Sequence, residues 1–597
     1  MLSLRSRFIL WVPLLAACEG VIRSPGAATG EAPIEPSTTH IDVPYVPGGA
    51  GGSGGTSGVG GAGGSGGIAG HGGAGGGGTV AEVIPPFSAG ALRQRRLRAW
   101  QYKNAIEDLL GSKAMAAVAP PADVSIDGLE VLGAAQLVLS TSQAEAYETS
   151  AFAAVAAGLA DTASAPKVLT CTPKAATDTV CFRTIISTWG RRAFRRTLDP
   201  TEVDVWAQIA VAAATAYAAP LKGVELALAG MLQSPHFLYQ VETGVADGTY
   251  PSTQKLSGTE LATRLSFFIT GHLPTAALLT TAEAGGLDTA AGLELEASKL
   301  LATQSPAGLR SLFSEWFSTR EVATQAKDPK VFPSYTAAIV ASLQKEAEML
   351  IDATVLADGA DVRTVLTSNF TFVNSTLQTH YGWPVTATAT TFVKVPFPAN
   401  ERRAGFMTQG AFLASKANTA APSSTRRGKF VRDMLLCETI PAPPPNVNDT
   451  MLPQPTSSAT ARDRVAPRLA SGYCGACHKR MEPFGLSLEN FDAVGKFRAQ
   501  EGGAIIDASG KFDDGSTFAD GAELSAKVAK DPRFAQCFAR MVMREALGHV
   551  DGEGETVSVR DVAQGLSASG FQLKGALLAL VKSEAFRYGN LEGSAHP

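Results

Sequence analysis

The pentapeptide Cys474-Gly-Ala-Cys477-His478, near the C-terminal end, constrains the possible folds more than any other stretch of the chain. This Cys-x-x-Cys-His spacing attaches a c-type haem, because two thiols three positions apart reach the porphyrin and the next histidine reaches the iron. We therefore expect one haem c, bound covalently through Cys474 and Cys477, with His478 as the proximal axial ligand. The surrounding fold must leave room for a flat macrocycle.

Three other interpretations of the pentapeptide remain open. A chance match is disfavoured because the 597 residues include only seven cysteines. A structural zinc site needs four ligands, usually from a second Cys/His pair, and only the isolated Cys437, Cys537 and His549 are available. A thioredoxin-like redox pair should follow a β-strand, whereas residues 460–469 are polar and helix-like.

The first 18 residues resemble a bacterial lipoprotein signal. Arg5 and Arg7 precede a short apolar run over residues 8–15, which is typical of a secretion signal and too short to span a bilayer. Leu15-Ala16-Ala17-Cys18 resembles a lipobox, in which the cysteine becomes lipidated. We therefore predict a signal peptide at 1–17 and a membrane anchor through lipid on Cys18. A plain signal peptide that happens to contain a cysteine is the alternative.

Residues 18–90 have no pattern that could build a core. Positions 48–78 are almost entirely glycine, alanine and serine. Such a composition buries too little apolar surface to offset the loss of chain entropy. We expect a disordered, Gly-rich flexible tether here, with the folded body following it.

The rest of the chain has helical periodicity and very few strand patterns. Residues 98–110 place apolar side chains on one face and end at Gly111, while Asp199 to Glu202 and Ser257 to Glu260 are helix-start signals. The fold class is therefore predicted to be mainly α and multi-domain. We expect N-terminal helical domains at 91–220, a central helical domain at 221–390, a haem-attachment domain at 400–500 and a C-terminal helical domain at 501–590.

Four further cysteines are disulfide candidates, because export places them in an oxidising compartment. Cys171, Cys181, Cys437 and Cys537 allow three pairings. We favour Cys171 with Cys181, which closes a short loop, and Cys437 with Cys537, which joins the flanks of the haem segment. The other two pairings stay open.

Other polar features are expected to be structural. The cluster Arg191-Arg192-Ala-Phe-Arg195-Arg196 should be a solvated helix face paired with carboxylates. His236, His272 and His380 are expected to pack or cap rather than to catalyse.

Several motifs resemble one bacterial family, the exported cytochrome c-like proteins built of consecutive domains of unknown function (the 1592/1588/1585 type). These motifs are Tyr102-x-Asn104, Arg191 to Arg196, Ser234-Pro-His-Phe-Leu-Tyr239, Leu261-Ala-x-Arg264, Arg426-Arg-Gly-Lys-Phe-Val431, Cys474 to Asp492, Ile506-Asp507 and Cys537 to Gly548. The resemblance covers about residues 91–590. It implies a haem-bearing surface or periplasmic protein and a C-terminal cytochrome c-like haem region, but no substrate. This chain departs from the family at His549, where an arginine is usual.

The remaining contacts of the iron are less constrained. The second ring nitrogen of His478 should be held by a backbone carbonyl, for which Pro483 is our suggestion. Met541 or Met543 is predicted as the distal ligand, with His549 as a third option. The alternative is that both methionines fill the core.

The predicted function is electron transfer or redox chemistry at the cell envelope of a Gram-negative bacterium, on the periplasmic or cell-surface face. The expected partners are the membrane, through Cys18, and a redox partner protein. A net charge of −4 gives no attraction to nucleic acid. Two alternatives stay open: a haem enzyme with an open iron acting on a small oxidant, and a non-enzymatic surface protein that binds, for example, polysaccharide. Whether the protein is an enzyme is not decided by the sequence.

Overall fold

The structure is a computed structural model that describes residues 86–250, 253–441 and 460–591. The chain divides into two compact units, residues 1–80 and 81–597, and all described residues belong to the second. The predicted signal peptide (1–17), the lipidation site Cys18 and nearly all of the predicted tether (18–90) lie outside the described residues.

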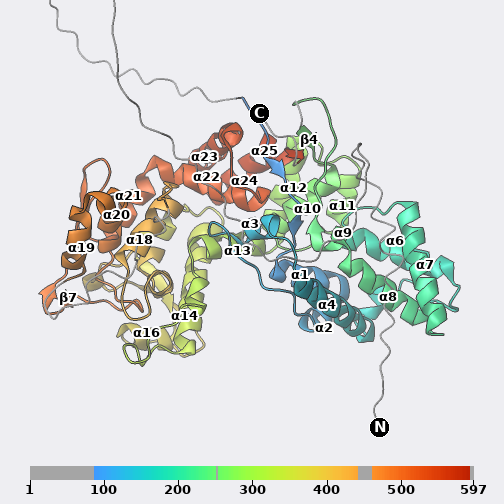
Figure 1. Cartoon of the computed structure of the whole chain (residues 1–597), viewed down its shortest axis with the longest axis horizontal. Coiled ribbons are helices and arrows are strands. Elements are labelled where there is room, and N and C mark those ends of the chain that lie inside the picture. The colour runs from blue at the N-terminus through green and yellow to red at the C-terminus, as the bar shows by residue number, and fades with distance from the viewer. Residues whose placement is uncertain (1–85, 251–252, 442–459, 592–597) are drawn as a thin grey trace, which may run out of the picture. The chain divides into compact units, whose positions relative to one another are not determined.

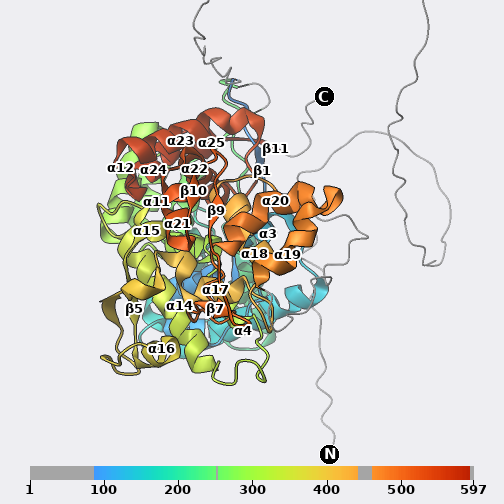
Figure 2. The same cartoon turned by 90° about the vertical axis from the view of Figure 1, so that its left-hand side faces the viewer.

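The predicted mainly α fold class is confirmed, since helices dominate the described residues and the strands form only small sheets (Figure 1). The strands are β1 Ala91–Leu92, β2 Arg95–Arg96, β3 Tyr239–Gln240, β4 Thr253–Lys255, β5 Phe370–Val373, β6 Val393–Pro396, β7 Gln500–Glu501, β8 Ala504–Ile505, β9 Gly510–Lys511, β10 Thr517–Phe518 and β11 Tyr588–Leu591. β11 pairs in parallel with β1 and antiparallel with β4. The two ends of the folded unit therefore lie side by side (Figure 2).

The first group of helices surrounds its own apolar core. These helices are α1 Ala99–Leu110, α2 Ser112–Ala116, α4 Thr141–Ala160, α5 Ala165–Val168, α6 Thr179–Ala193, α7 Pro200–Ala216, α8 Pro220–Gln233 and α9 Pro235–Leu238. Between α2 and α4 lies α3 Glu130–Gln136, whose Val131 and Leu132 belong to the main apolar core instead. α1 buries Tyr102, Ile106 and Leu109 along one face and ends at Gly111, whose φ is 87°. The predicted start of α7 is also confirmed, because Asp199 accepts a hydrogen bond from the backbone of Thr201.

The middle of the chain adds a second group of helices. They are α10 Gly258–Ile269, α11 Ala276–Glu283, α12 Ala290–Thr303, α13 Ala307–Trp316, α14 Ala337–Ile351, α15 Thr364–Thr367 and α16 Ser375–Tyr381, with the short turns η1 Glu321–Ala323 and η2 Asp352–Leu356. The predicted capping box at α10 is present, since the Ser257 amide donates to Glu260 Oε2 at 2.7 Å and the Ser257 hydroxyl accepts from the Glu260 amide.

The C-terminal part contains the Cys-x-x-Cys-His segment. Its elements are α17 Gly410–Ser415, α18 Ser424–Phe430, α19 Ala461–Ala470, α20 Gly472–Leu486, α21 Gly521–Lys530, α22 Pro532–Leu547, α23 Thr556–Ala568, α24 Leu573–Lys582 and α25 Glu584–Arg587, with the turns η3 Ala399–Glu401, η4 Phe406–Thr408, η5 Val431–Leu435 and η6 Glu553–Glu555. α18 and α19 both pack against α20 (Figures 1 and 2).

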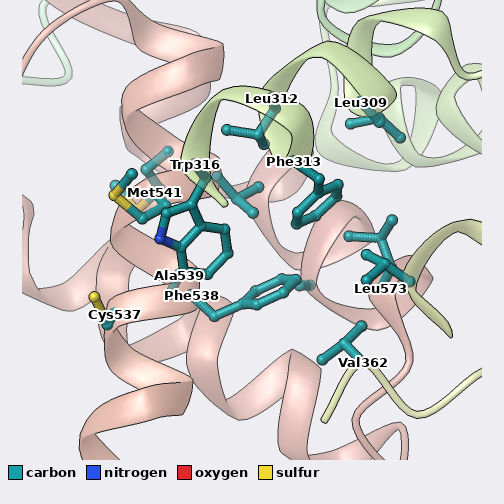
Figure 3. Close-up of a cluster of buried hydrophobic side chains, with 14 of the residues drawn as sticks. Leu309, Leu312, Phe313, Trp316, Val362, Cys537, Phe538, Ala539, Met541 and Leu573 are labelled. Atoms are coloured by element: carbon teal, nitrogen blue, oxygen red, sulfur yellow. The ribbon is translucent and has the colours of Figure 1, made fainter. Parts of the chain in front are cut away.

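The main apolar core joins segments that are distant in the sequence. Phe313 and Trp316 of α13 lie against Phe538 of α22, with Leu573 of α24 nearby (Figure 3). Phe313 and Phe538 have ring centroids 5.7 Å apart. Because aromatic side chains bury large apolar areas, this contact couples the middle of the chain to its C-terminal helices.

Two disulfides link four of the described cysteines in the arrangement favoured above. Cys171 pairs with Cys181, and Cys437 pairs with Cys537 over a sequence separation of 100. The second bond fastens the end of η5 to α22, and the Cys-x-x-Cys-His segment lies within the loop that it closes. None of the described helices is both long enough and apolar enough to cross a membrane.

Candidate functional site

The Cys-x-x-Cys-His segment forms the first turns of α20. Ser471 caps this helix, and its Oγ accepts a hydrogen bond from the amide of Cys474 at 3.2 Å. α19 precedes it and packs on it through a small apolar cluster that includes Val465 and Leu486. Among the described residues, the element directly before the two cysteines is therefore a helix, where a thioredoxin-like pair would follow a strand.

One face of α20 carries both thiols and the imidazole. Residues three and four positions apart are neighbours on a helix surface, so Cys474 lies one turn from Cys477 and His478. Both thiols are free and half-buried. Cys437 and Cys537 are joined to each other, so neither is a thiolate ligand for a zinc site. The described parts of the chain hold no group of three or more His, Cys, Asp or Glu arranged around a metal ion.

Glu482 lies one further turn along the same face and contacts His478. Its side chain is 0% exposed, and its Oε1 lies 3.0 Å from Nδ1 of His478. The same oxygen accepts from the Thr425 hydroxyl at 2.6 Å, and Oε2 accepts from the Ser424 hydroxyl. Nη1 of Arg468 is 3.7 Å from Oε1. A buried carboxylate is costly unless such donors surround it.

These contacts keep Glu482 ionised. Burial by itself would raise the pKa of this carboxyl, but hydrogen bonds from His478, Ser424 and Thr425 outweigh burial and leave the pKa below its ordinary value. Nε2 of His478 makes no hydrogen bond with any described residue. One ring nitrogen is thus held by a carboxylate, and the other is available to a ligand.

Glycines allow α18 and α20 to approach closely enough for these contacts. A Cβ on Gly485 would lie 1.7 Å from the carbonyl oxygen of Ser424, and one on Gly428 would lie 1.9 Å from that of Met481. Both distances are far below van der Waals contact, so only glycine fits at either position. The crossing places Ser424 and Thr425 against Glu482.

Two buried arginines bind backbone carbonyls within α20 and just after it. Arg427 is 0% exposed and donates to the carbonyls of Leu488 and Phe491 at 2.8 and 2.9 Å. Arg432 donates to the carbonyl of Arg480 at 2.9 Å and pairs with Asp513 at 2.6 Å. Burial lowers the pKa of Arg427 to about 10. These contacts fix the orientation of α20 and therefore of its Cys-x-x-Cys-His face.

The contact expected from the carbonyl of Pro483 is made instead by the side chain of Glu482. Helix geometry is the reason. A residue four positions after His478 places its side chain beside the imidazole, whereas the carbonyl of Pro483 points along the helix axis toward the following turn.

Both methionines predicted as distal ligands are core residues in this structure. Met541 is 1% exposed and Met543 is 0% exposed, and both belong to the main apolar core. Figure 3 shows Met541 beside Trp316. Packing of α22 against α13 buries these side chains, as the alternative interpretation had it, and a distal role for either stays a prediction.

His549 and the other histidines are engaged elsewhere. Nε2 of His549 lies 3.0 Å from both carboxylate oxygens of Glu555. His272 Nδ1 lies 3.0 Å from Asp108, and His380 Nε2 lies 2.8 Å from the carbonyl of Val494. His236 packs on Phe194 with ring centroids 5.4 Å apart.

The arginine cluster at the end of α6 is only partly solvated. Arg191 and Arg196 pair with Glu283 and Glu202, as expected of a solvated face. Arg195 differs, because it is 3% exposed and its Nη2 donates to the carbonyl of His236 at 2.7 Å. It has a φ of 59°, so the chain leaves the helix there and turns this side chain inward. Burial lowers its pKa to about 9.

Glu482 was not among the residues singled out from the sequence. Its spacing of four from His478 was a usable signal, since such pairs meet on a helix. Ser424 and Thr425 carried no comparable signal, because their positions depend on how α18 packs against α20.

The chain matches five protein families in succession, each described as a protein of unknown function. The matches are DUF1587 at residues 95–160, DUF1595 at 181–242, DUF1592 at 256–383, DUF1588 at 403–501 and DUF1585 at 514–586. The DUF1588 domain, which contains the Cys-x-x-Cys-His segment, carries the short name PSCyt3. No curated protein and no solved structure matches the chain.

The order of these domains agrees with the resemblance that the motifs indicated. Together the five matches cover most of the chain after residue 95. The protein belongs to the cytochrome c-like family built of consecutive domains of unknown function, with DUF1592, DUF1588 and DUF1585 following one another.

Proposed function

We propose that this protein is an exported, membrane-tethered, mono-haem c-type cytochrome-like protein that serves electron transfer or redox chemistry at the cell envelope. One observation carries the proposal. Cys474, Cys477 and His478 lie along one face of α20 as two free thiols and an imidazole whose Nε2 has no hydrogen-bond partner among the described residues. This donor set fits covalent attachment of haem and ligation of its iron.

Each of these residues of α20 would have a separate role in holding the haem. Cys474 and Cys477 would hold the porphyrin as thioethers, and Nε2 of His478 would bind the iron. When bound, the haem would exchange one electron between its ferric and ferrous states. Glu482 contacts the imidazole, and the crossing of α18 with α20 holds Glu482 in place.

The location follows from the N-terminal sequence. Residues 1–17 and the lipobox-like Leu15-Ala16-Ala17-Cys18 support export and lipidation at Cys18, and the Gly-rich stretch supports a tether. We place the protein at the envelope of a Gram-negative bacterium, on the periplasmic or cell-surface face. A redox partner protein would accept or supply the electron.

A haem enzyme with an open iron is the second candidate. The complete burial of Met541 and Met543 favours it, since neither is presented at a surface that a haem could reach without opening the core. An iron that lacks a sixth protein ligand binds small molecules.

The deciding experiment is expression of the exported protein together with the haem-attachment machinery. We expect a c-type pyridine haemochrome from the wild type and none from Cys474→Ala with Cys477→Ala. Ala476→Ser is the matched control, because Ala476 is an exposed residue between the two cysteines, and it should keep full haem content. Wild-type protein without covalent haem would overturn the proposal.

Carbon monoxide then separates the two candidates. A six-coordinate haem that does not bind carbon monoxide indicates an electron carrier. A haem that binds carbon monoxide in the reduced state indicates the open iron of an enzyme.

A further inference from the structure

We propose that Glu482 is a positioning residue for the proximal ligand: its carboxylate holds a proton on Nδ1 of His478, directs Nε2 outward and strengthens the imidazole as a donor to iron. The part that concerns iron rests on the proposed function. The part that concerns the imidazole is a property of this chain by itself.

The geometry of the pair supports this role. Nδ1 of His478 lies 3.0 Å from Oε1 of Glu482, which is hydrogen-bonding distance. Glu482 is 0% exposed and His478 keeps 21% of its side chain exposed. The imidazole is therefore held from the interior and open toward the solvent side, where both thiols are also partly exposed.

A carboxylate makes this contact stronger than a carbonyl would. Hydrogen bonds to ionised acceptors are roughly twice as strong as neutral ones. An imidazole that donates from Nδ1 to a carboxylate is a more basic ligand at Nε2. A more electron-rich ligand stabilises ferric iron over ferrous iron, so Glu482 should lower the reduction potential.

Substitution of Thr425 offers a second test, because its effect on the reduction potential should be opposite to that of Glu482→Gln. The hydroxyl of Thr425 donates to the same Oε1 that faces His478, at 2.6 Å. The Thr425 hydroxyl and the His478 imidazole therefore compete for the same carboxylate oxygen. Removing the hydroxyl should strengthen the hydrogen bond between His478 and Glu482.

The first measurement uses haem-free protein, obtained as Cys474→Ala with Cys477→Ala and labelled in histidine for nitrogen NMR. We expect the neutral imidazole of His478 to carry its proton on Nδ1. Adding Glu482→Gln should move the population toward the Nε2 proton that free imidazole side chains favour in water. If His478 carries its proton on Nε2 while Glu482 is intact, or if adding Glu482→Gln leaves the tautomer unchanged, the inference is overturned.

The second measurement is the midpoint potential of the haem-loaded protein. Poised at the wild-type midpoint, Glu482→Gln should hold an about tenfold excess of reduced over oxidised haem, which corresponds to about 59 mV for a one-electron couple. Thr425→Val should shift the ratio in the opposite direction. If both variants shift the midpoint potential in the same direction, or if neither shifts it, the proposal is contradicted.

Glu489→Gln is the matched control for both measurements. Glu489 is also a buried carboxylate of this region, at 3% exposure, but it pairs with Arg498 at 2.8 Å and does not contact His478. Its substitution should leave the tautomer of His478 unchanged and move the potential far less than Glu482→Gln does. A shift as large as that of Glu482→Gln would show a general charge effect and overturn the assignment.

The two measurements keep the inference separate from the proposed function. If the wild type forms no haemochrome, the proposed function fails and the tautomer measurement decides the role of Glu482. If haem is attached and neither the tautomer nor the potential depends on Glu482, the inference fails and the proposed function stands.

Discussion

Arg98 and Glu545 form a buried ion pair although 447 residues separate them. The guanidinium of Arg98 is 2% exposed and also contacts Glu315 of α13 at 3.3 Å. A second buried set joins Arg95 and Arg264 to Glu242 at 2.6 and 2.7 Å. The first residues of the folded unit are thus paired with carboxylates from its middle and its end.

Substitution of Arg98 should destabilise the fold strongly. Arg98→Met leaves Glu545 buried without its ion-pair partner, and removing one member of a buried pair costs about 3–5 kcal/mol. Urea denaturation measures the difference. Arg560→Met is the control, because Arg560 pairs with Asp561 on the surface at 44% exposure, and it should cost no more than about 1 kcal/mol. Equal losses in the two variants would refute the importance of burial.

The disulfide Cys437–Cys537 should stabilise the protein more than Cys171–Cys181. The first closes a loop of 100 residues and the second one of 10. The entropy removed from the unfolded chain grows with loop length, to about 4.7 kcal/mol for about 100 residues and about 3 kcal/mol for about 15. Thermal unfolding of the two double Cys→Ser variants checks the order. A larger loss from the short loop would contradict this explanation.

Gly485→Ala should separate α18 from α20. The added Cβ would lie 1.7 Å from the Ser424 carbonyl, and such overpacking costs about 1–3 kcal/mol or more. We expect lower stability by denaturation and lower haem content in cells that attach haem. Gly472→Ala is the control on the same helix, since a Cβ there meets nothing within 4 Å. It should be neutral or slightly stabilising, because alanine favours helix over glycine.

The stability of the fold should fall as pH rises, in part through Glu346. Burial raises the pKa of Glu346 to about 7, although hydrogen bonds from Tyr381 and Thr371 act in the opposite direction. The folded pKa then exceeds the unfolded value of about 4.3, so the native state binds more protons between these values. Stability is lost as pH rises through this window and levels off above it.

Urea denaturation at pH 5 and pH 8 measures this effect. Glu346 should account for a loss of about 2–3 kcal/mol over that interval, and Glu346→Gln should remove this part of the slope. Glu348→Gln is the control, because Glu348 lies on the same helix at 38% exposure and pairs with Lys345. A slope that is the same in wild type and Glu346→Gln would show that Glu346 ionises at its ordinary pKa.

Local signals in the sequence predicted local structure well. The glycine stop at Gly111, the cap at Asp199 and the capping box at Ser257 all act within four residues, and all three are present in the structure. Helical periodicity was sufficient for the fold class for the same reason. The Cys-x-x-Cys-His face of α20 also follows from spacing alone, because one helix carries all of its members.

Contacts between residues that are distant in the sequence could not be predicted from local patterns. Arg195 looked like part of a charged surface, but a positive φ turns it into the interior. The burial of Met541 and Met543 was one of two open alternatives, and the packing of α13 on α22 produces it. In each case the deciding contact comes from a segment far away in the chain.

The sequence by itself determined the mainly helical fold class and the segment that we propose binds haem, because each depends on spacing within one stretch of chain. Only the tertiary structure decided what surrounds that segment: Ser424 and Thr425 donate hydrogen bonds to Glu482, and Glu482 contacts His478. It also decided that Arg98 pairs with Glu545. The physical reason is that burial and charge pairing are set by how separate helices pack, and one helix does not encode the position of another.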